Sequence, residues 1–188
     1  MFRDLILKNR SYRRFYENEK IPMDTLKELV DLARLSPNGA NRQGLRFFLS
    51  DGAMNDAILS CLGWAGYLTD WDGPEPGERP AAYIVILNDK FIGGGEADVG
   101  IAATSILLGA VELGYGGCMF GAVNRQKLSG ILKLPENITV SLVIALGKPK
   151  ETVVLDTVKD DDIKYWRDEN RVHHVPKRKL EDILYNMP

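Results

Sequence analysis

The sequence predicts a layered fold of the α/β or α+β class, because stretches typical of strands alternate with stretches typical of helices. Two continuous apolar runs, residues 81–89 and 138–147, indicate strands that are buried on both faces. Between them, residues 96–114 predict a helix of about five turns that is apolar on nearly every face. Such a helix lies inside a core, so these three segments define the centre of the fold.

The N-terminal half adds two helices and a strand to this centre. Residues 21–37 predict an amphipathic helix that Asp24 caps and Pro37 ends. Residues 45–50 are short and aromatic, which favours a strand, and residues 52–64 predict a second helix.

The rest of the chain is predicted from its turn residues and short apolar runs. Residues 70–80 form a loop rich in Pro, Gly and acidic residues, and such loops often border functional sites. A short strand and turn are expected at 116–123 and a helix at 124–134. Residues from about 150 to 188 form a C-terminal arm with little core of its own, which suggests that the arm docks on a partner subunit. We therefore expect a single domain over residues 1–188, in a homodimer.

Composition narrows the classes of function. The 188 residues carry 24 Lys and Arg against 26 Asp and Glu, and a net charge of −2 argues against a nucleic-acid-binding protein. The sequence shows neither a signal peptide nor a membrane span. Cys61 and Cys118 have no metal-site spacing, and the adjacent His173 and His174 cannot form an i, i+4 metal pair. These features predict a cytoplasmic protein with no membrane partner and no metal.

Residues 9–15, "NRSYRRF", concentrate positive charge near the N-terminus. Arg10 and Ser11 offer a guanidinium, a hydroxyl and a backbone N–H that are close enough together to bind one phosphate group. The alternative is a solvated helix face whose arginines pair with Glu17 and Glu19. A second basic cluster, "PKRKL" at 176–180, is either a second part of a phosphate site or a solvated charged surface, which is the usual explanation of such a run.

Two further segments suit a flat heterocyclic ligand. Asn38, Asn41 and Gln43 gather amides in one turn, and amides match the alternating donors and acceptors of a heterocycle. A capped turn is the alternative. The segment "GYGGCMFGAV" does not match the G-x-G-x-x-G fingerprint of dinucleotide-binding proteins. Its glycines either let the backbone approach a flat ligand closely or form a tight turn at the start of a strand. "IGGGEAD" is excluded as an anion site because Glu96 and Asp98 would repel the anion.

The sequence offers few groups for acid, base or nucleophilic catalysis, since both of its histidines lie in the arm and it has no nucleophile elbow or P-loop. A protein of this kind takes its chemistry from a cofactor. In this order, the segments resemble the FMN-dependent nitroreductase family. "NRSYRRF" is similar to that family's R-R-S-x-R-x-F, "ARLSPNGANRQGLRF" to its A-P-S-x-x-N-x-Q-P-W-x-F, and "KRKLEDIL" to its C-terminal R-K-P-L-E-E.

The resemblance implies an α+β fold: a three-layer sandwich with a central mixed sheet, in a domain-swapped homodimer with two FMN sites at the interface. It implies an FMN-dependent oxidoreductase that moves a hydride in ping-pong order from NADH or NADPH to a small organic acceptor, such as a nitroaromatic compound or a quinone. FMN carries the chemistry, so no catalytic side chain is expected. The alternative is a flavin-binding sensor or carrier without turnover.

The resemblance also implies roles for individual residues. The phosphate and the pyrimidine side of the flavin would be held by Arg10, Ser11 and Arg13, with Lys177 and Arg178 closing on the phosphate. The amides of Asn38, Asn41 and Gln43 would reach the flavin, some of them from the other subunit. The flavin would be lined by Met119, Phe120 and Gly121, and the substrate pocket by Trp64, Tyr67 and Trp71.

Two positions depart from the family pattern. Asn9 stands where the family has its first arginine, which weakens one phosphate contact. Gly44 and Leu45 replace the usual Pro-Trp pair, so the packing beneath the flavin differs.

Overall fold

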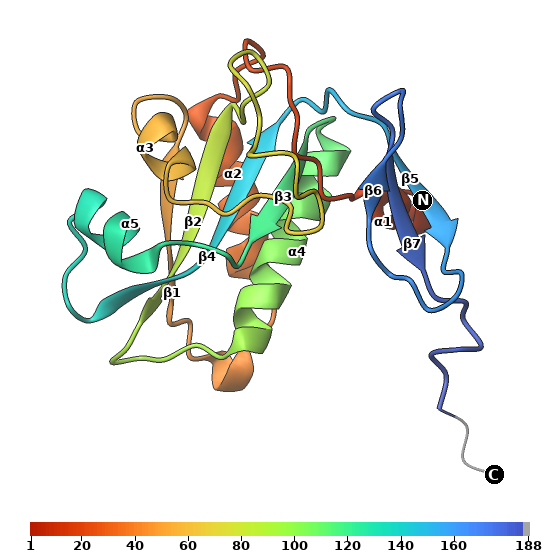
Figure 1. Ribbon diagram of the computed structural model, residues 1–188. Helices are drawn as coiled ribbons and strands as arrows, with labels where there is room; N and C mark the ends of the chain where they lie inside the picture. Colours follow the sequence, from red (N-terminus) through yellow and green to blue (C-terminus); the bar gives the residue numbers. More distant parts are fainter. Residues whose placement is uncertain (186–188) are drawn as a thin grey trace.

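In a computed structural model, which describes residues 1–185, the centre of the molecule is a four-stranded sheet in the order β1-β2-β4-β3 (Figure 1). The strands are β1 (Leu45–Ser50), β2 (Ala82–Asp89), β3 (Gly116–Phe120) and β4 (Ile138–Gly147). The two central strands, β2 and β4, are the long apolar runs of the sequence, and their residues are buried or half-buried throughout. The strand expected at residues 45–50 is confirmed.

The four-stranded sheet is antiparallel, so the expectation of a mixed sheet was wrong for these strands. The segments β2, α4 (Glu96–Glu112) and β3 do form a crossover, and β2 and β3 run in the same direction. However, β4 lies between them and pairs antiparallel with both. The crossover therefore does not make β2 and β3 a hydrogen-bonded parallel pair, because β4, which comes later in the sequence, lies between them.

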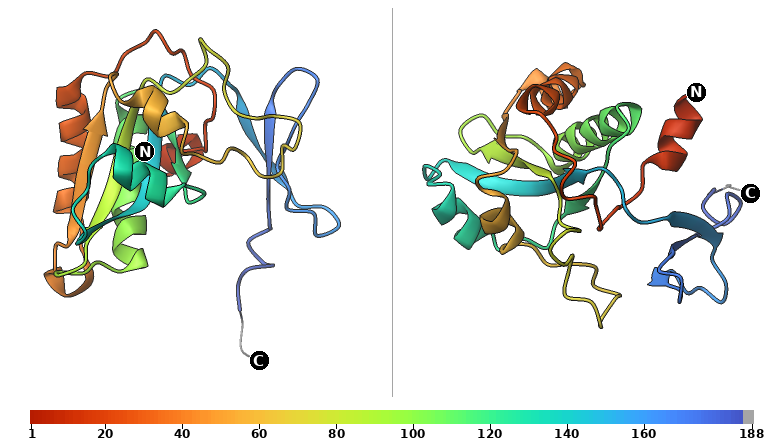
Figure 2. Two further views of the ribbon diagram at one scale, coloured as in Figure 1. Left: turned by 60° about the vertical axis from the view of Figure 1, so that its left-hand side comes forward. Right: turned by 90° about the horizontal axis from the view of Figure 1, so that it is seen from above.

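Helices cover both faces of this sheet, which confirms the three-layer α+β architecture (Figures 1 and 2). On one face, α2 (Met23–Leu35) and α4 pack a core that includes Leu29 and Ile106. On the other face, α3 (Asn55–Leu59) and α5 (Arg125–Ile131) pack a second core around Ile58 and Leu128.

Helix ends differ from their expected positions in two places. Pro22, not Asp24, occupies the N-cap position of α2, and the Asp24 carboxylate instead accepts a hydrogen bond from Lys27 at 2.9 Å. The helix expected over 52–64 is only the short α3, because the chain after Ser60 turns to form a bridge between Leu62 and Val123.

The N-terminus begins with α1 (Phe2–Lys8), a helix that we did not expect from the sequence. Beyond it, the arginine segment, residues 9–15, is extended: Ser11 forms a parallel bridge with Gly117 and Phe15 an antiparallel bridge with Pro149. The alternative of a solvated helix face is therefore wrong. Arg14 pairs with Glu78 and not with Glu17 or Glu19.

The arm contains a small sheet of its own, in the order β5-β7-β6. Its strands are β5 (Val153–Thr157), β6 (Trp166–Arg167) and β7 (His173–Lys177), and this sheet stands apart from the four-stranded sheet in every view (Figures 1 and 2). The chain then extends away from the body (Figure 1). Among the described residues, no helix is long and apolar enough to cross a membrane.

Candidate functional site

The arginine segment and the arm enclose a cavity of about 290 Å³, here called the arginine pocket. Its lining residues are Asn9, Arg10, Ser11, Arg13, Tyr165, His173, Val175 and Lys177. Four of the residues predicted to hold a phosphate, Arg10, Ser11, Arg13 and Lys177, are thus brought together from the two ends of the chain. Three of these four side chains are cationic, so the pocket suits an anion.

Pairing with β3 holds the arginine segment in place. The backbone N–H of Tyr12 donates to the Gly117 carbonyl at 3.0 Å, beside the Ser11–Gly117 bridge. This approach needs a glycine at 116, because a Cβ there would lie 2.5 Å from the Tyr12 ring. Arg10 donates to the Ile6 carbonyl at 2.7 Å, while its buried Nε has no partner among residues 1–185.

The arm fixes Arg13 through three contacts. Its backbone N–H donates to the Glu151 carboxylate, its guanidinium lies 4.7 Å from the centre of the Tyr165 ring, and its Nη1 lies 3.1 Å from Nε2 of His173. Burial, together with the nearby Arg13, lowers the pKa of His173 to about 4. The imidazole is therefore neutral near pH 7 and accepts a hydrogen bond from the guanidinium.

Two basic residues, Arg178 of the predicted set and Arg14 outside it, have other partners. Arg178 lies outside the arginine pocket and pairs with the exposed Asp161 at 2.7 Å. Arg14 is 5% exposed and donates through both Nε and Nη2 to Glu78, which is 8% exposed. Lys150 also reaches Glu78, at 3.2 Å. The hydrogen bonds from Arg14 lower the pKa of Glu78 to about 2, so this carboxylate is ionised throughout the neutral range.

The three predicted amides lie in the turn between α2 and β1, here called the amide turn (residues 38–43). The backbone φ angle is positive at Ala40, Asn41 and Gln43, which is costly for an alanine and concentrates local strain at this turn. Gln43 donates its backbone N–H to the Asn38 side chain at 3.2 Å, so part of the amide set stabilises the turn itself.

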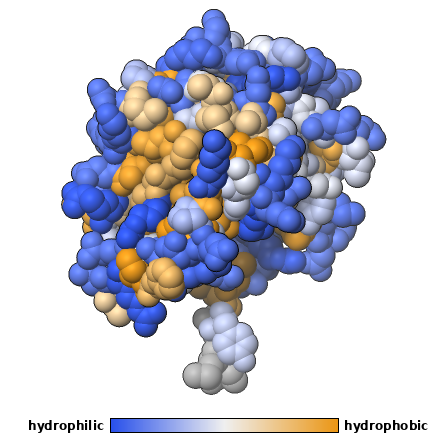
Figure 3. Space-filling model, turned by 90° about the vertical axis from the view of Figure 1, so that its left-hand side faces the viewer, coloured by the Kyte–Doolittle hydropathy of each residue, from blue (hydrophilic) through white to orange (hydrophobic). Residues whose placement is uncertain are grey.

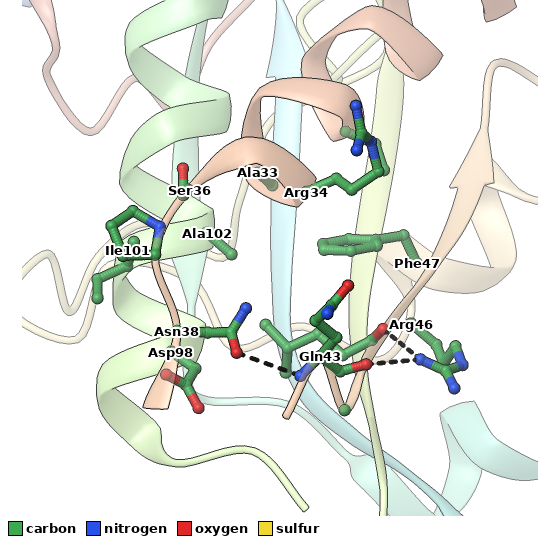
Figure 4. Close-up of a pocket in the computed structure, with 14 residues that line it drawn as sticks. Ala33, Arg34, Ser36, Asn38, Gln43, Arg46, Phe47, Asp98, Ile101 and Ala102 are labelled. Atoms are coloured by element: carbon green, nitrogen blue, oxygen red, sulfur yellow. Dashed lines mark hydrogen bonds between the residues drawn. The ribbon is translucent and has the colours of Figure 1, made fainter. Parts of the chain in front are cut away.

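The amide turn borders a second cavity, of about 350 Å³, between α2, α4 and β1 (Figure 4). Asn38 and Gln43 line it together with apolar side chains such as Phe47 and Ile101, whereas Asn41 does not. Gly44 lies against the Gly93 backbone, where a Cβ would sit 2.2 Å from the Gly93 carbonyl oxygen. This contact explains why residue 44 is a glycine in this chain.

The arginine segment and the amide turn lie at opposite ends of α4 (Figure 1). Gly39 of the turn bonds to Asp98 in the first turn of this helix, whereas Ser11 pairs with Gly117, beyond its last turn. A helix of 17 residues is about 25 Å long. One chain therefore does not bring the amides to the arginines.

The three residues expected to line a flavin follow the alternation of a strand. Met119 and Gly121 are exposed at the end of β3, but the Phe120 side chain is 4% exposed and belongs to the second core. Since successive side chains of a strand point to opposite faces, the side chains of Met119 and Phe120 cannot line one ligand together. From Phe120, only the backbone remains available to a ligand.

The aromatic loop, residues 63–80, connects this strand end with the arm. The Trp64 ring lies 4.6 Å from Phe120 and 5.8 Å from Trp71, measured between ring centres. The Tyr67 ring lies 4.9 Å from Tyr165, which lines the arginine pocket. Of the three predicted substrate-pocket aromatics, Tyr67 is thus the one whose ring contacts a residue of the arginine pocket.

Sequence reasoning placed Lys177 and Arg178 of the arm at the site but missed four further residues of the arm. Glu151, Tyr165, Arg167 and His173 contact Arg13 or the aromatic loop, and Arg167 lies 4.2 Å from the Trp71 ring. No spacing rule predicts these contacts, because the partners are about 100 or more residues apart in the chain. In the part of the chain that the structure describes, no group of three or more His, Cys, Asp or Glu side chains could hold a metal ion.

Comparison with known proteins places this arrangement in a family. The model of the nitroreductase family matches residues 6–62 and 73–148. Protein DrgA of Synechocystis sp. is 24% identical over 177 residues, covering 79% of this chain and 84% of that protein. A nitroreductase family protein from Clostridium novyi is 26% identical with a TM-score of 0.64, covering 80% and 87% of the two chains. The NADPH:FMN oxidoreductase of Vibrio harveyi, solved with NAD+, is 21% identical with a TM-score of 0.62, covering 79% and 69%.

Proposed function

This chain belongs to the nitroreductase family, and from that premise we propose that it is an FMN-dependent oxidoreductase using NADH or NADPH as electron donor. When bound, FMN supplies hydride transfer, from the nicotinamide to a small organic acceptor in ping-pong order. The observation that carries the proposal is the convergence of Arg10, Ser11, Arg13 and Lys177 on one pocket.

The arginine pocket fits the phosphate end of such a cofactor. Arginines bind phosphate oxygens through fixed pairs of N–H groups, and Lys177 adds a point charge. The buried Nε of Arg10, which has no partner among residues 1–185, is a donor that a phosphate oxygen would satisfy. Arg178 would join this set only if the end of the arm changed its present pairing with Asp161.

Arg13 is the residue whose direction is fixed most firmly. Glu151 holds its backbone N–H, and Tyr165 and His173 hold its guanidinium, so its charge does not need to reorganise when a ligand binds. A fixed guanidinium stabilises negative charge that develops on a group bound beside it. We assign it to the pyrimidine side of the flavin, where hydride acceptance adds electron density.

The separation of the two halves of the site supports a homodimer. In a two-fold dimer, Asn38, Asn41 and Gln43 of one chain would complete the arginine pocket of the other. The surface suits such an assembly: within residues 1–185, β1 is an edge strand that pairs with β2 alone, and Phe47 and Leu49 on it are half-buried. The side of the molecule that carries β1 shows an apolar area surrounded by hydrophilic residues (Figure 3).

The exposed apolar residues of the arm suit an exchange of ends between the two chains. Leu180, Ile183 and Leu184 are all more than half exposed, at the end of a segment that leaves the body of its own chain (Figure 1). Apolar side chains in this position gain free energy when a partner covers them. The domain-swapped dimer would bury them.

The aromatic loop suits an aromatic acceptor. The Trp64 and Trp71 rings pack against each other, and Tyr67, which is 49% exposed, contacts Tyr165 of the arginine pocket. Planar rings stack on such side chains with a favourable geometry. A nitroaromatic compound or a quinone would therefore bind between this loop and the cofactor.

An absorption spectrum of the purified protein tests the proposal. We expect a yellow protein that releases FMN on denaturation and is bleached by NADH or NADPH without oxygen. Bound flavin that neither nicotinamide reduces would instead favour the flavin carrier. A colourless protein that also fails to take up added FMN would contradict both functions.

A further inference from the structure

His173 lines the arginine pocket in a neutral form with one defined tautomer. Its side chain is fully buried in β7, and its Nε2 lies 3.1 Å from Nη1 of Arg13. A guanidinium does not lose its proton in a protein, so it can only donate in this contact. Nε2 must therefore carry the lone pair, and the ring proton resides on Nδ1.

The Nδ1–H group has no acceptor among residues 1–185, although it is buried. Leaving a buried donor unpaired costs free energy, and native structures rarely do so without a reason. The residue that carries it lines a pocket with three cationic side chains, Arg10, Arg13 and Lys177. An anion in that pocket brings acceptor oxygens and no competing donors.

Resting on the proposed function, we propose that His173 is a further cofactor-binding residue: Arg13 holds it in the Nδ1–H tautomer, and Nδ1–H donates to an oxygen of the bound FMN. The histidine thus adds a neutral donor beside the charged side chains of Arg10, Arg13 and Lys177. Because Arg13 itself lies against the same ring, the two residues act as a unit, one fixing the tautomer of the other.

The neighbouring His174 provides an internal control. It lies on the same strand, but its Nδ1 is 2.8 Å from Asp156 and its Nε2 is 3.5 Å from Asp168. Both of its nitrogens therefore have carboxylate partners, and it does not line the arginine pocket. A ligand in the pocket should change the signals of His173 and leave those of His174 in place.

Nuclear magnetic resonance of protein labelled with ¹⁵N in its two histidines tests this directly. In the free protein near neutral pH, we expect the long-range ¹H–¹⁵N pattern of a neutral Nδ1–H ring for His173. Saturation with FMN should shift its Nδ1 and Hδ1 resonances. A shift with inorganic phosphate alone assigns the acceptor to the phosphate, and a shift with riboflavin alone assigns it to the ribityl chain or the ring.

Two amide variants separate direct binding from positioning. His173→Asn places its amide nitrogen near the position of Nδ1, whereas His173→Gln places its amide near Nε2, against Arg13. We expect FMN affinity to fall about tenfold or more in His173→Gln and to be largely kept in His173→Asn, since one hydrogen bond is lost in the former. His174→Gln should leave the affinity unchanged.

An Nε2–H tautomer in the free protein, or an unshifted His173 signal in protein shown to be saturated with FMN, would overturn the inference. The reverse order of the two amide variants would also overturn it, because it would mean that His173 only positions Arg13. Failure of the wild-type protein to bind FMN at all would contradict the proposed function instead. In that case the tautomer of the free protein still tests the Arg13–His173 unit.

Discussion

The Asp98 carboxylate accepts a hydrogen bond from the backbone N–H of Gly39 at 2.7 Å, and its second oxygen accepts one from Gly95 at 2.9 Å. The carboxylate thereby joins the amide turn to the first turn of α4. The sequence argument excluded an anion site at this helix end because acidic residues would repel a ligand. In the structure, Asp98 itself fills the place that a bound anion would take.

Replacing Asp98 with alanine should loosen the amide turn. Its two backbone hydrogen bonds lower the pKa of Asp98, so the contribution is present above the ordinary pKa of an aspartate and is lost as pH falls through the lowered value. Hydrogen exchange of residues 38–43 should accelerate in Asp98→Ala, and FMN affinity should fall with it. Asp24→Ala, which removes an exposed carboxylate of α2, is the control. Unchanged exchange in the turn would show that Asp98 does not hold it.

The buried pair of Arg14 and Glu78 should dominate the acid sensitivity of the fold. Glu78→Gln leaves the Arg14 charge buried without its counter-ion, a change that costs on the order of 3 kcal/mol of unfolding free energy. With a folded-state pKa of about 2, Glu78 contributes stability above about pH 4.5 that is lost as pH falls toward 2. Urea unfolding at several pH values measures both effects.

In the Glu78→Gln variant, the slope of stability against pH between 4.5 and 2 should therefore be smaller than in the wild type. Asp31→Asn breaks a comparable but exposed pair with Arg34 and should change the melting temperature little. Equal losses in the two variants would mean that burial of the Arg14–Glu78 pair has no special effect.

The arginine pocket predicts which basic residues matter for cofactor affinity. Arg10→Ala removes a charged donor from the pocket and should weaken FMN binding about 10- to 100-fold. Lys177→Ala should weaken it by a smaller factor. Arg178→Ala should have little effect, because Arg178 pairs with Asp161 outside the pocket. Fluorescence quenching of FMN on titration gives the three affinities, and a strong effect of Arg178 alone would require the arm to rearrange on binding.

Two residues of the aromatic loop, Tyr67 and Trp64, should differ in their effects on acceptor binding and on the stability of the fold. Tyr67 is half exposed, so Tyr67→Ala should raise the KM for an aromatic acceptor with little change in melting temperature. Trp64 packs against the buried Phe120, so Trp64→Ala should also destabilise the fold. Steady-state kinetics with a nitroaromatic acceptor and with a small aliphatic one provide the comparison. A Tyr67→Ala enzyme with unchanged KM for both would remove the loop from the acceptor site.

Local pattern accounts for what the sequence predicted well. The central strands β2 and β4 and the buried helix α4 have strong, long signals in the sequence. The small sheet of the arm has strands of two to five residues, too short for periodicity to reveal. Alternation along β3 could have shown that Phe120 faces the core. The site itself depends on pairings such as Arg13 with Glu151, 138 residues apart, which no local rule reaches.

A mixture of two inactive variants should recover cofactor binding if the site is shared between chains. The arginine segment and the amide turn lie at opposite ends of α4, and in the proposed two-fold dimer Arg10 of one chain lies near Asn41 of the other. Arg10→Ala and Asn41→Ala should each weaken FMN binding at both sites of their homodimers. A mixed dimer has one site with both changes and one site with neither.

After unfolding and refolding of an equimolar mixture, random pairing should restore tight binding at about a quarter of all sites. A mixture of Arg10→Ala with Lys177→Ala is the matched control, because both residues line one pocket of one chain and should show no recovery. If the Arg10→Ala and Lys177→Ala mixture recovers binding and the Arg10→Ala and Asn41→Ala mixture does not, then Lys177 and not Asn41 comes from the partner. This outcome is expected if the exchanged part of the arm includes β7. Light scattering on the same samples gives the subunit number, and a monomer that binds FMN tightly would contradict the shared site.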